Sequence, residues 1–195
     1  AALETEDLVS LSTGSIGALS TAQVRALSTA QLAALTTAQV RALSSTQLNR
    51  LTTAQVAGLN TGNLKAIGTG ALQGVSSTQL NALSLKQMKS VDLQDIAALT
   101  TGQISALKVA DIAELTAAQV GALGTQQVAA MSSAQVGALS VGQLLALSTQ
   151  QIRAISTQGI AALSGAQISK LRNDQIAALT AGNDAQLSST NPQGP

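Results

Sequence analysis

Residues 20–27 read STAQVRAL, and octads of this kind repeat along most of the 195-residue chain. Every eighth residue from Leu3 to Leu187 is large and apolar, and a second apolar series lies three residues before the first, from Leu8 to Ile176. Self-similarity at a fixed period is typical of repeat proteins, whose units stack and bury a continuous core. The sequence therefore predicts a repeat architecture before any local propensity is considered.

The expected array is a single octapeptide-repeat solenoid over residues 1–187, with 23 octads numbered from Glu4. Residues 188–195 read SSTNPQGP, and their two prolines and missing aliphatic residues forbid a further octad. We expect a flexible tail or linker there.

Each octad has the pattern of a helix start. A Ser or Thr such as Ser20 is followed three residues later by Gln23, which is the spacing of a capping box: the hydroxyl accepts from the N3 amide, and the Gln side chain reaches back to the N-cap amide. Gln fills this fourth position in 15 of 23 octads. Leu19 and Val24 occupy the two positions of a hydrophobic staple. We expect one short helix per octad, with a sharp turn at each Leu-Ser junction.

One continuous helix is excluded, because an eight-residue repeat would drift by about 80° per octad around a helix of 3.6 residues per turn. Alternate octads also differ. The fifth position is often Val in odd octads, as in Val24 and Val40, and mainly Leu or Ile in even octads, as in Leu32 and Leu48. We therefore expect an all-α solenoid of very short helices, with two octads, or 16 residues, in each coil. A β-solenoid is the alternative, since Val, Ile, Thr and Gly are frequent.

The composition argues against catalysis. The chain contains no His, Cys, Phe, Tyr or Trp, and its Ser and Thr residues occupy expected cap positions, so no activated nucleophile stands out. We expect no enzyme, no cofactor and no small-molecule substrate. A net charge of +1 does not favour nucleic-acid binding. Polar residues interrupt every octad, so no stretch reaches the roughly 18 to 20 apolar residues that span a membrane.

Asp95 and Asp111 are weak candidates for a metal site. Both replace Gln at the fourth position of even octads and lie 16 residues apart, so their carboxylates would stack in a coil of two octads. Calcium prefers several oxygen ligands. A first-turn Asp also suits the helix dipole, and that role alone accounts for both residues.

Charged residues suggest a possible interaction surface. Residues 8–91 contain six basic residues and no acidic one. In a coil of two octads, Arg25 and Arg41 would stack on one face, and Lys89 occupies the same sixth position of an odd octad. This basic surface could receive the acidic start of another molecule, formed by Glu4, Glu6 and Asp7.

Threonines at the second position form a further row at intervals of two octads. Such a row would resemble the flat Thr rows of ice-binding solenoids. Its members are Thr5, Thr21, Thr37, Thr53 and Thr69.

Residues 19–26, LSTAQVRA, and residues 35–42, LTTAQVRA, resemble the tracts of very large bacterial secreted or surface proteins of the adhesin or haemagglutinin kind. The resemblance covers nearly the whole chain. It implies an extracellular stalk, fibre or adhesin repeat region, and it assigns no catalytic residue.

We therefore expect a secreted or cell-surface bacterial structural protein that forms a stiff rod, stalk or fibre. It would associate end to end with itself or be joined to flanking domains of a longer chain. The alternative is a binding module that presents a repetitive face to a protein, a glycan or ice. The absence of aromatic residues argues against stacking on carbohydrate and against ordinary protein hot spots.

Overall fold

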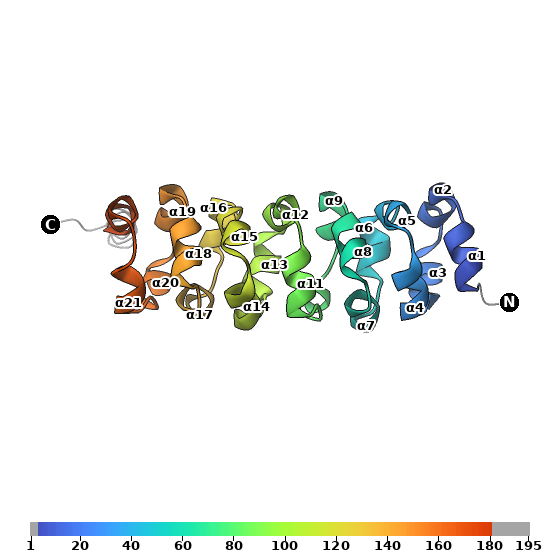
Figure 1. Ribbon diagram of the computed structural model, residues 1–195, viewed down its shortest axis with the longest axis horizontal. Helices are drawn as coiled ribbons and strands as arrows, with labels where there is room; N and C mark the ends of the chain where they lie inside the picture. Colours follow the sequence, from blue (N-terminus) through green and yellow to red (C-terminus); the bar gives the residue numbers. More distant parts are fainter. Residues whose placement is uncertain (1–3, 181–195) are drawn as a thin grey trace, which may run out of the picture. The chain divides into compact units, whose positions relative to one another are not determined.

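The computed structural model describes residues 4–180, and these residues are helical apart from the connections, with no strand among them (Figure 1). The expected all-α solenoid of very short helices, one per octad, is confirmed, and the β-solenoid is wrong for this range. The tail expected at 188–195 lies outside the described residues.

The helices follow one another along the chain at intervals of about one octad. Residues 173–180 form the last described helix. The helices before it are α1 Thr5–Ser10, α2 Thr13–Gly17, α3 Thr21–Ala26, α4 Thr29–Ala34, α5 Thr37–Arg41, α6 Ser45–Asn49, α7 Thr53–Ala57, α8 Thr61–Ala66, α9 Thr69–Leu72, α10 Ser77–Leu80, α11 Leu85–Ser90, α12 Leu93–Ala98, α13 Thr101–Ala106, α14 Val109–Glu114, α15 Ala117–Gly121, α16 Thr125–Ala129, α17 Ser133–Gly137, α18 Val141–Ala146, α19 Thr149–Arg153, α20 Thr157–Ala161 and α21 Gly165–Ile168.

The chain divides after Leu99 into two compact units. The first unit contains α1 to α12, and the second contains α13 to α21 and the helical residues 173–180.

Successive helices are joined by two residues in extended conformation. Leu27, which ends α3, has φ −66° and ψ 141°, and Ser28, which caps α4, has φ −70° and ψ 160°. No described residue has a positive φ, so this turn does not require the glycine that ends many helices. A Leu followed by a Ser or Thr is sufficient, and the turn expected at this junction is confirmed.

The expected capping boxes are present in most helices. In α3 the Ser20 Oγ accepts from the Gln23 backbone N–H at 3.2 Å, and the Gln23 Oε1 accepts from the Ser20 backbone N–H at 2.8 Å. Helices of four to six residues leave most of their N–H groups without an intrahelical partner. The capping box therefore satisfies a large share of the backbone donors in each octad.

The fourth-position Gln also has a second role, which was not predicted from the sequence. The Gln39 Nε2 donates toward the carbonyl oxygens of Leu8, Val9 and Leu11 at 3.0, 3.1 and 2.9 Å. These carbonyls belong to the last turn and C-cap of α1, where few intrahelical N–H groups remain; the Leu8 carbonyl also accepts from the Leu11 N–H at 3.3 Å. A single side-chain amide therefore caps the start of α5 with its oxygen and the end of α1 with its nitrogen.

This pattern, in which one side-chain amide forms hydrogen bonds at two helix ends, recurs in both units, and we call it the glutamine ladder. Each rung joins a fourth-position amide to carbonyls 28 to 31 residues earlier in the chain. The rungs formed within one unit are those of Gln39, Gln47, Gln55, Asn63, Gln79, Gln87, Gln135, Gln143, Gln151, Gln167 and Gln175.

The coil is wider than two octads, so the expected 16-residue coil is wrong. In each unit, packed helices are three apart in the chain, for example α1 with α4, α5 with α8 and α17 with α20. The ladder joins octads that are four apart. One turn of the array therefore takes between three and four octads. Octads separated by 16 residues share similar side chains, yet similar side chains do not require adjacent positions in space.

Both apolar series form the core of each unit. Leu32 and Leu144 of the fifth-position series are fully buried, and Leu35 and Leu147 of the eighth-position series are almost fully buried. Burying an aliphatic side chain of this size contributes about 1.5 to 3 kcal/mol. Since isolated helices of this length are unstable in water, the buried series and the ladder together stabilise them.

Octad 9 departs from the pattern and contains α9, which has only four residues. Its N-cap is Gly68, which offers no side-chain cap, and its fourth position is Ala71, which cannot form a rung. A Cβ added to Gly74 would lie 2.6 Å from the Ser45 Cβ and carbonyl oxygen, whereas a Cβ at Gly70 would meet nothing within 4 Å. Gly74 is therefore needed for close packing against α6, and Gly70 is not.

The ladder predicts a large loss of stability when a rung is removed. Gln143 accepts from the Ser140 N–H at 2.7 Å and donates toward the Ile112, Ala113 and Leu115 carbonyls. Gln143→Ala should lower the free energy of unfolding by about 2 to 4 kcal/mol, because it leaves buried polar groups at two helix ends unsatisfied. Urea unfolding followed by far-UV circular dichroism measures the change. Gln150→Ala, at an exposed position one helix later, is the control and should change the stability little.

Gly70 and Gly74 of octad 9 predict opposite effects. Gly70→Ala should raise the free energy of unfolding by about 0.5 to 1 kcal/mol, because alanine restricts the unfolded chain and favours the helix. Gly74→Ala should lower it by about 1 to 3 kcal/mol through overpacking against Ser45. Thermal unfolding of both variants checks the pair, and equal effects would contradict the packing described for Gly74.

Candidate functional site

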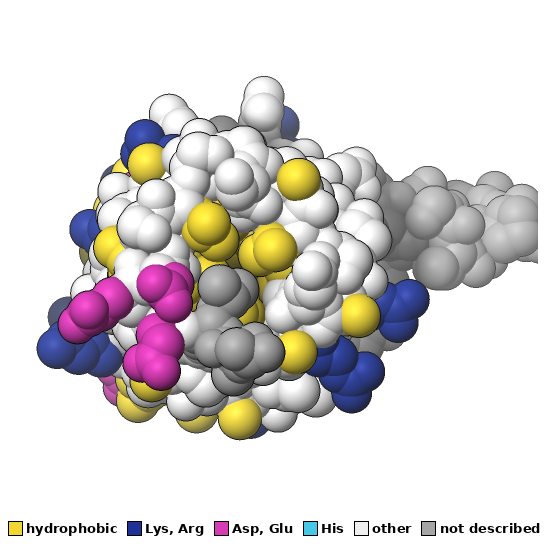
Figure 2. All heavy atoms as spheres, turned by 90° about the vertical axis from the view of Figure 1, so that its right-hand side faces the viewer, with side chains coloured by type: hydrophobic (Ala, Val, Ile, Leu, Met, Phe, Trp, Pro, Cys, Tyr) yellow, Lys and Arg dark blue, Asp and Glu magenta, His cyan; other side chains and the backbone are white. Residues whose placement is uncertain are grey.

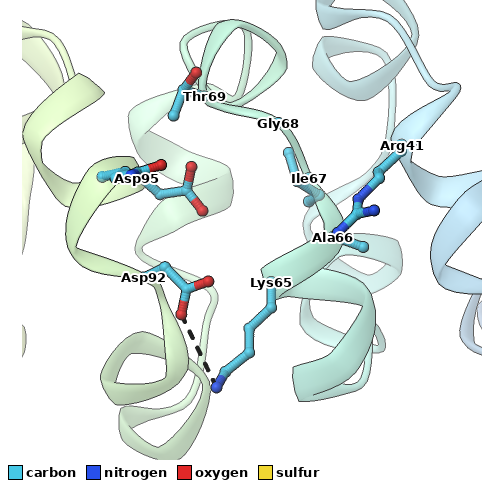
Figure 3. A pocket seen from close by; sticks show the side chains of 9 residues that line it. Arg41, Lys65, Ala66, Ile67, Gly68, Thr69, Asp92 and Asp95 are labelled. Carbon is cyan, nitrogen blue, oxygen red and sulfur yellow. Dashed lines mark ion pairs between the residues drawn. The ribbon is translucent and has the colours of Figure 1, made fainter.

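The charged side chains of the first unit line shallow surface depressions. One of them has a volume of about 340 Å³ and lies between the ends of α5 and α8 and the starts of α9 and α12 (Figure 3). Its charged lining residues are Arg41, Lys65, Asp92 and Asp95. We call it the mixed-charge depression, since two basic and two acidic side chains share it.

Lys65 and Asp92 form an ion pair at the rim of this depression. The Lys65 Nζ lies 3.9 Å from the Asp92 Oδ1, and both side chains are more than half exposed. An exposed pair at this distance contributes at most about 1 kcal/mol. The pair therefore orients the two charges without holding the octads together.

Asp95 is the unusual member of the depression. It occupies the fourth position of octad 12, where other octads carry the ladder Gln, and only 6% of it is exposed. No hydrogen bond or ion pair joins its side chain to another described residue. Figure 3 shows its carboxylate pointing toward the segment of Ile67 and Gly68. Burial, and secondarily the charge of Asp92, raises the pKa of Asp95 above its usual value.

Asp111 has a similar environment in the second unit. It is 4% exposed, and its Oδ2 is buried without a hydrogen-bond partner. Burial raises the pKa of Asp111, and the nearby charge of Lys108 opposes that shift. Asp95 and Asp111 belong to different units, and within residues 4–180 no group of three or more Asp, Glu, His or Cys side chains is gathered as a metal site.

The expected basic row is not formed as the sequence suggested. Arg25 lines a depression of about 220 Å³ together with Arg50, which belongs to the octad three further on. Arg41 instead lies at the mixed-charge depression with Lys65. The stacking expected for Arg25 and Arg41 is wrong, because helices that are two apart are not the packed pairs. Lys89 lies exposed in the last turn of α11.

The threonine row fails for the same reason. Thr5 and Thr21 lie on α1 and α3, whereas α1 packs against α4. Threonines spaced by two octads therefore do not follow neighbouring helices. The geometric argument for an ice-binding face is lost with the 16-residue coil.

The acidic residues at the start of the described chain are exposed. Glu4 is the N-cap of α1, and Glu6 and Asp7 lie in its first turn, where negative charge suits the helix dipole. Figure 2 views this end of the first unit and shows acidic side chains at one side of a face that also presents apolar side chains. Docking of this surface on a basic partner stays a prediction.

The chemistry available in the described residues is that of hydroxyls, amides, carboxylates and a few cations. Ser and Thr hydroxyls at the N-caps are engaged by the N3 amides, as Ser20 and Ser140 show. No described helix has both the length and the apolar character needed to cross a bilayer. The buried carboxylates of Asp95 and Asp111 are the features that capping and core packing do not explain.

The buried Asp111 carboxylate predicts that the free energy of unfolding depends on pH. Because its pKa in the folded chain lies above the ordinary value of 3.8, the folded state binds this proton more tightly than the unfolded state, and stability falls as the pH rises through the folded pKa. Asp111→Asn should raise the free energy of unfolding by about 1 to 3 kcal/mol near neutral pH, since a neutral amide avoids the cost of burying a charge. The gain in stability should shrink as the pH falls through the folded pKa of Asp111 toward its ordinary value, and it should be smallest below that ordinary value. Urea unfolding at several pH values measures it.

The control for this prediction is Asp174→Asn. Asp174 is exposed, and a hydrogen bond from Arg172 lowers its pKa. Its replacement should give no gain in stability at neutral pH. A gain of equal size in both variants would mean that overall charge, and not the buried site, causes the effect.

Comparison with known proteins identifies the repeat. The family model of the ALTTAQ repeat matches residues 1–37, 29–61, 109–141 and 141–173, which together make up more than half of the chain. Residues 34–39 read ALTTAQ and contain the ladder residue Gln39. A search of curated proteins found no match. The chain belongs to the ALTTAQ repeat family.

Proposed function

We propose that this chain is a structural spacer: a stiff repeat tract of a secreted or cell-surface bacterial protein, which holds other parts of an assembly apart and associates end to end. The proposed role is mechanical.

The glutamine ladder is the observation that carries this proposal. Each rung ties the start of one helix to the end of another that is four octads earlier, as with Gln135 and the Ile104 and Leu107 carbonyls at 2.9 and 2.8 Å. An array in which each octad contacts octads three and four positions away resists local extension, because separating two turns breaks several bonds and exposes buried aliphatic residues together. Stiffness is the property that a spacer needs.

The sequence features of the tract support the extracellular part of the proposal. The absence of Cys is compatible with export, and the octads resemble those of large bacterial surface proteins. The length of such an array can change by whole octads without altering its packing, which suits a spacer whose reach is adjusted by repeat number.

The proposal predicts that length follows repeat number. Duplicating residues 132–163, which comprise four octads, should lengthen the particle by about 10 Å in small-angle X-ray scattering, since stacked helices are spaced by about 8 to 10 Å. Two such insertions should add twice that length. A particle that grows equally in all dimensions would contradict a spacer.

End-to-end association and location are tested separately. Sedimentation velocity over a range of protein concentrations should show species that grow by whole chains, and electron microscopy should show them as filaments. An antibody to the chain should label intact producing cells. Labelling that requires permeabilised cells would exclude the proposed location and leave the mechanical role to be judged from the scattering data.

A further inference from the structure

We propose that the depression between α3 and α6 binds the sulfate ester groups of an acidic polysaccharide. Arg25 and Arg50 hold the anion, and the uncharged polar side chains beside them face the sugar chain. The site lies within the first unit. It goes beyond the spacer role proposed above and does not depend on it.

The packing of the helices brings the two arginines to one depression. Arg25 lies in the last turn of α3, and Arg50 is the C-cap of α6. These two helices, which are three octads apart, pack against each other. Both arginines line a depression of about 220 Å³ together with Thr21 and Ala22. Two positive charges therefore border the same small volume.

No acidic side chain of the described chain neutralises these charges. Arg25 and Arg50 are exposed, and neither side chain forms a hydrogen bond or an ion pair with a described residue. The helix α6 also packs against α9, and all three helices lie within residues 8–91, where the sequence has no acidic residue. Since like charges at one depression repel each other, an anion bound between them is stabilised by both.

The following steps of this row of helices are closed in another way. The Asn49 Nδ2 donates to the Gly74 carbonyl oxygen at 2.7 Å, and Gln73 forms the equivalent bond one step further. Each bond joins the sixth position of an octad to a carbonyl 25 residues later. Arg25 holds the sixth position at the preceding step, and the residue at the same distance from it is Arg50. At this step two free cations take the place of an amide–carbonyl bond.

A sulfate ester suits two arginines and a hydroxyl. A guanidinium group presents its N–H donors in a planar fork that matches two oxygens of an oxyanion. The Thr21 hydroxyl is a further donor, because the capping box of α3 uses Ser20 and Gln23 instead. Two forks and one hydroxyl are enough donors for the three terminal oxygens of the ester.

The surface next to the arginines favours a sugar chain as the carrier of the anion. Arg50 also lines a depression of about 280 Å³ with Ser45, Thr46, Asn49 and Gly74. Its uncharged hydroxyls and amide can exchange hydrogen bonds with sugar hydroxyls. A nucleic acid carries a phosphate at every nucleotide and needs a longer run of cations, and a lipid surface needs a larger basic cluster. Sparse anions on a hydroxyl-rich polymer therefore fit this surface best.

The test measures binding of the full chain to fluorescein-labelled dextran sulfate by fluorescence anisotropy at low salt. Carboxymethyl dextran and unmodified dextran are the matched polymers. Dextran sulfate should bind most tightly, its binding should weaken as sodium chloride is added, and unmodified dextran should not bind. Arg25→Gln and Arg50→Gln should each weaken binding about threefold to tenfold, since each removes one charge-assisted contact. Arg25→Lys should also weaken it, because lysine keeps the charge and loses the fork.

Arg153→Gln is the matched control, since Arg153 holds the same sixth position as Arg25 but lies in the second unit and is exposed. It removes the same charge and should leave binding almost unchanged. Thermal unfolding shows that the variants fold. Arg25→Gln should unfold at the same temperature as the unaltered chain or higher, because a Gln at this position can donate to the Arg50 carbonyl as Gln73 does one octad row further on.

Several outcomes would overturn the proposal. Equal weakening in Arg153→Gln and Arg25→Gln would mean that the attraction is general, and unchanged binding in Arg25→Gln would mean that the depression is not the site. Carboxymethyl dextran that binds as tightly as dextran sulfate would exclude a preference for sulfate. Tighter binding of single-stranded DNA, or of vesicles that contain phosphatidic acid, would exclude a polysaccharide as the preferred ligand.

Discussion

The side-chain amide of the fourth-position glutamine is the interaction on which the rest of this structure depends. A helix of five residues leaves nearly all its amides and carbonyls without partners, so a protein made of such helices needs another source of donors and acceptors in every octad. Gln39 shows the solution: its oxygen accepts from the N-cap of its own helix, and its nitrogen donates to the end of a helix four octads earlier. One residue type thereby completes two helix ends and joins successive turns.

Four departures from this arrangement lie in one stretch of the chain. In four octads between residues 63 and 111, Gln is replaced at the fourth position, by Asn63, Ala71, Asp95 and Asp111. Asn63 still forms a rung, Ala71 leaves one open, and the two carboxylates replace a donor with an acceptor. The mixed-charge depression lies within this stretch. An octad that lacks the ladder Gln, and in which no other group replaces its hydrogen bonds, is a place where a repeat protein can acquire specific chemistry.

Much of the local structure could be predicted from the octad. The capping box, the turn at the Leu-Ser junction and the two buried apolar series were expected and are present, because each depends on residues within one or two octads. The ladder was missed, although one signal was available. Glu would serve the capping box and the helix dipole equally well, yet no octad has Glu at the fourth position. Only the amide nitrogen explains that choice, and its partners are 28 to 31 residues away.

The octad alone is enough to predict one short helix per octad, the residue at which each helix begins and the side chains that are buried, because these follow from local hydrogen bonding and apolar spacing. The identity of the neighbouring octads, in contrast, is known only from the folded chain. All octads offer similar surfaces, so the pattern suits several numbers of octads per turn, and the alternation of Val with Leu or Ile suggested two. In the folded chain, packed helices are three octads apart and the Gln amides reach carbonyls four octads earlier. That geometry separated Arg25 from Arg41 and placed Asp95 against the end of α8.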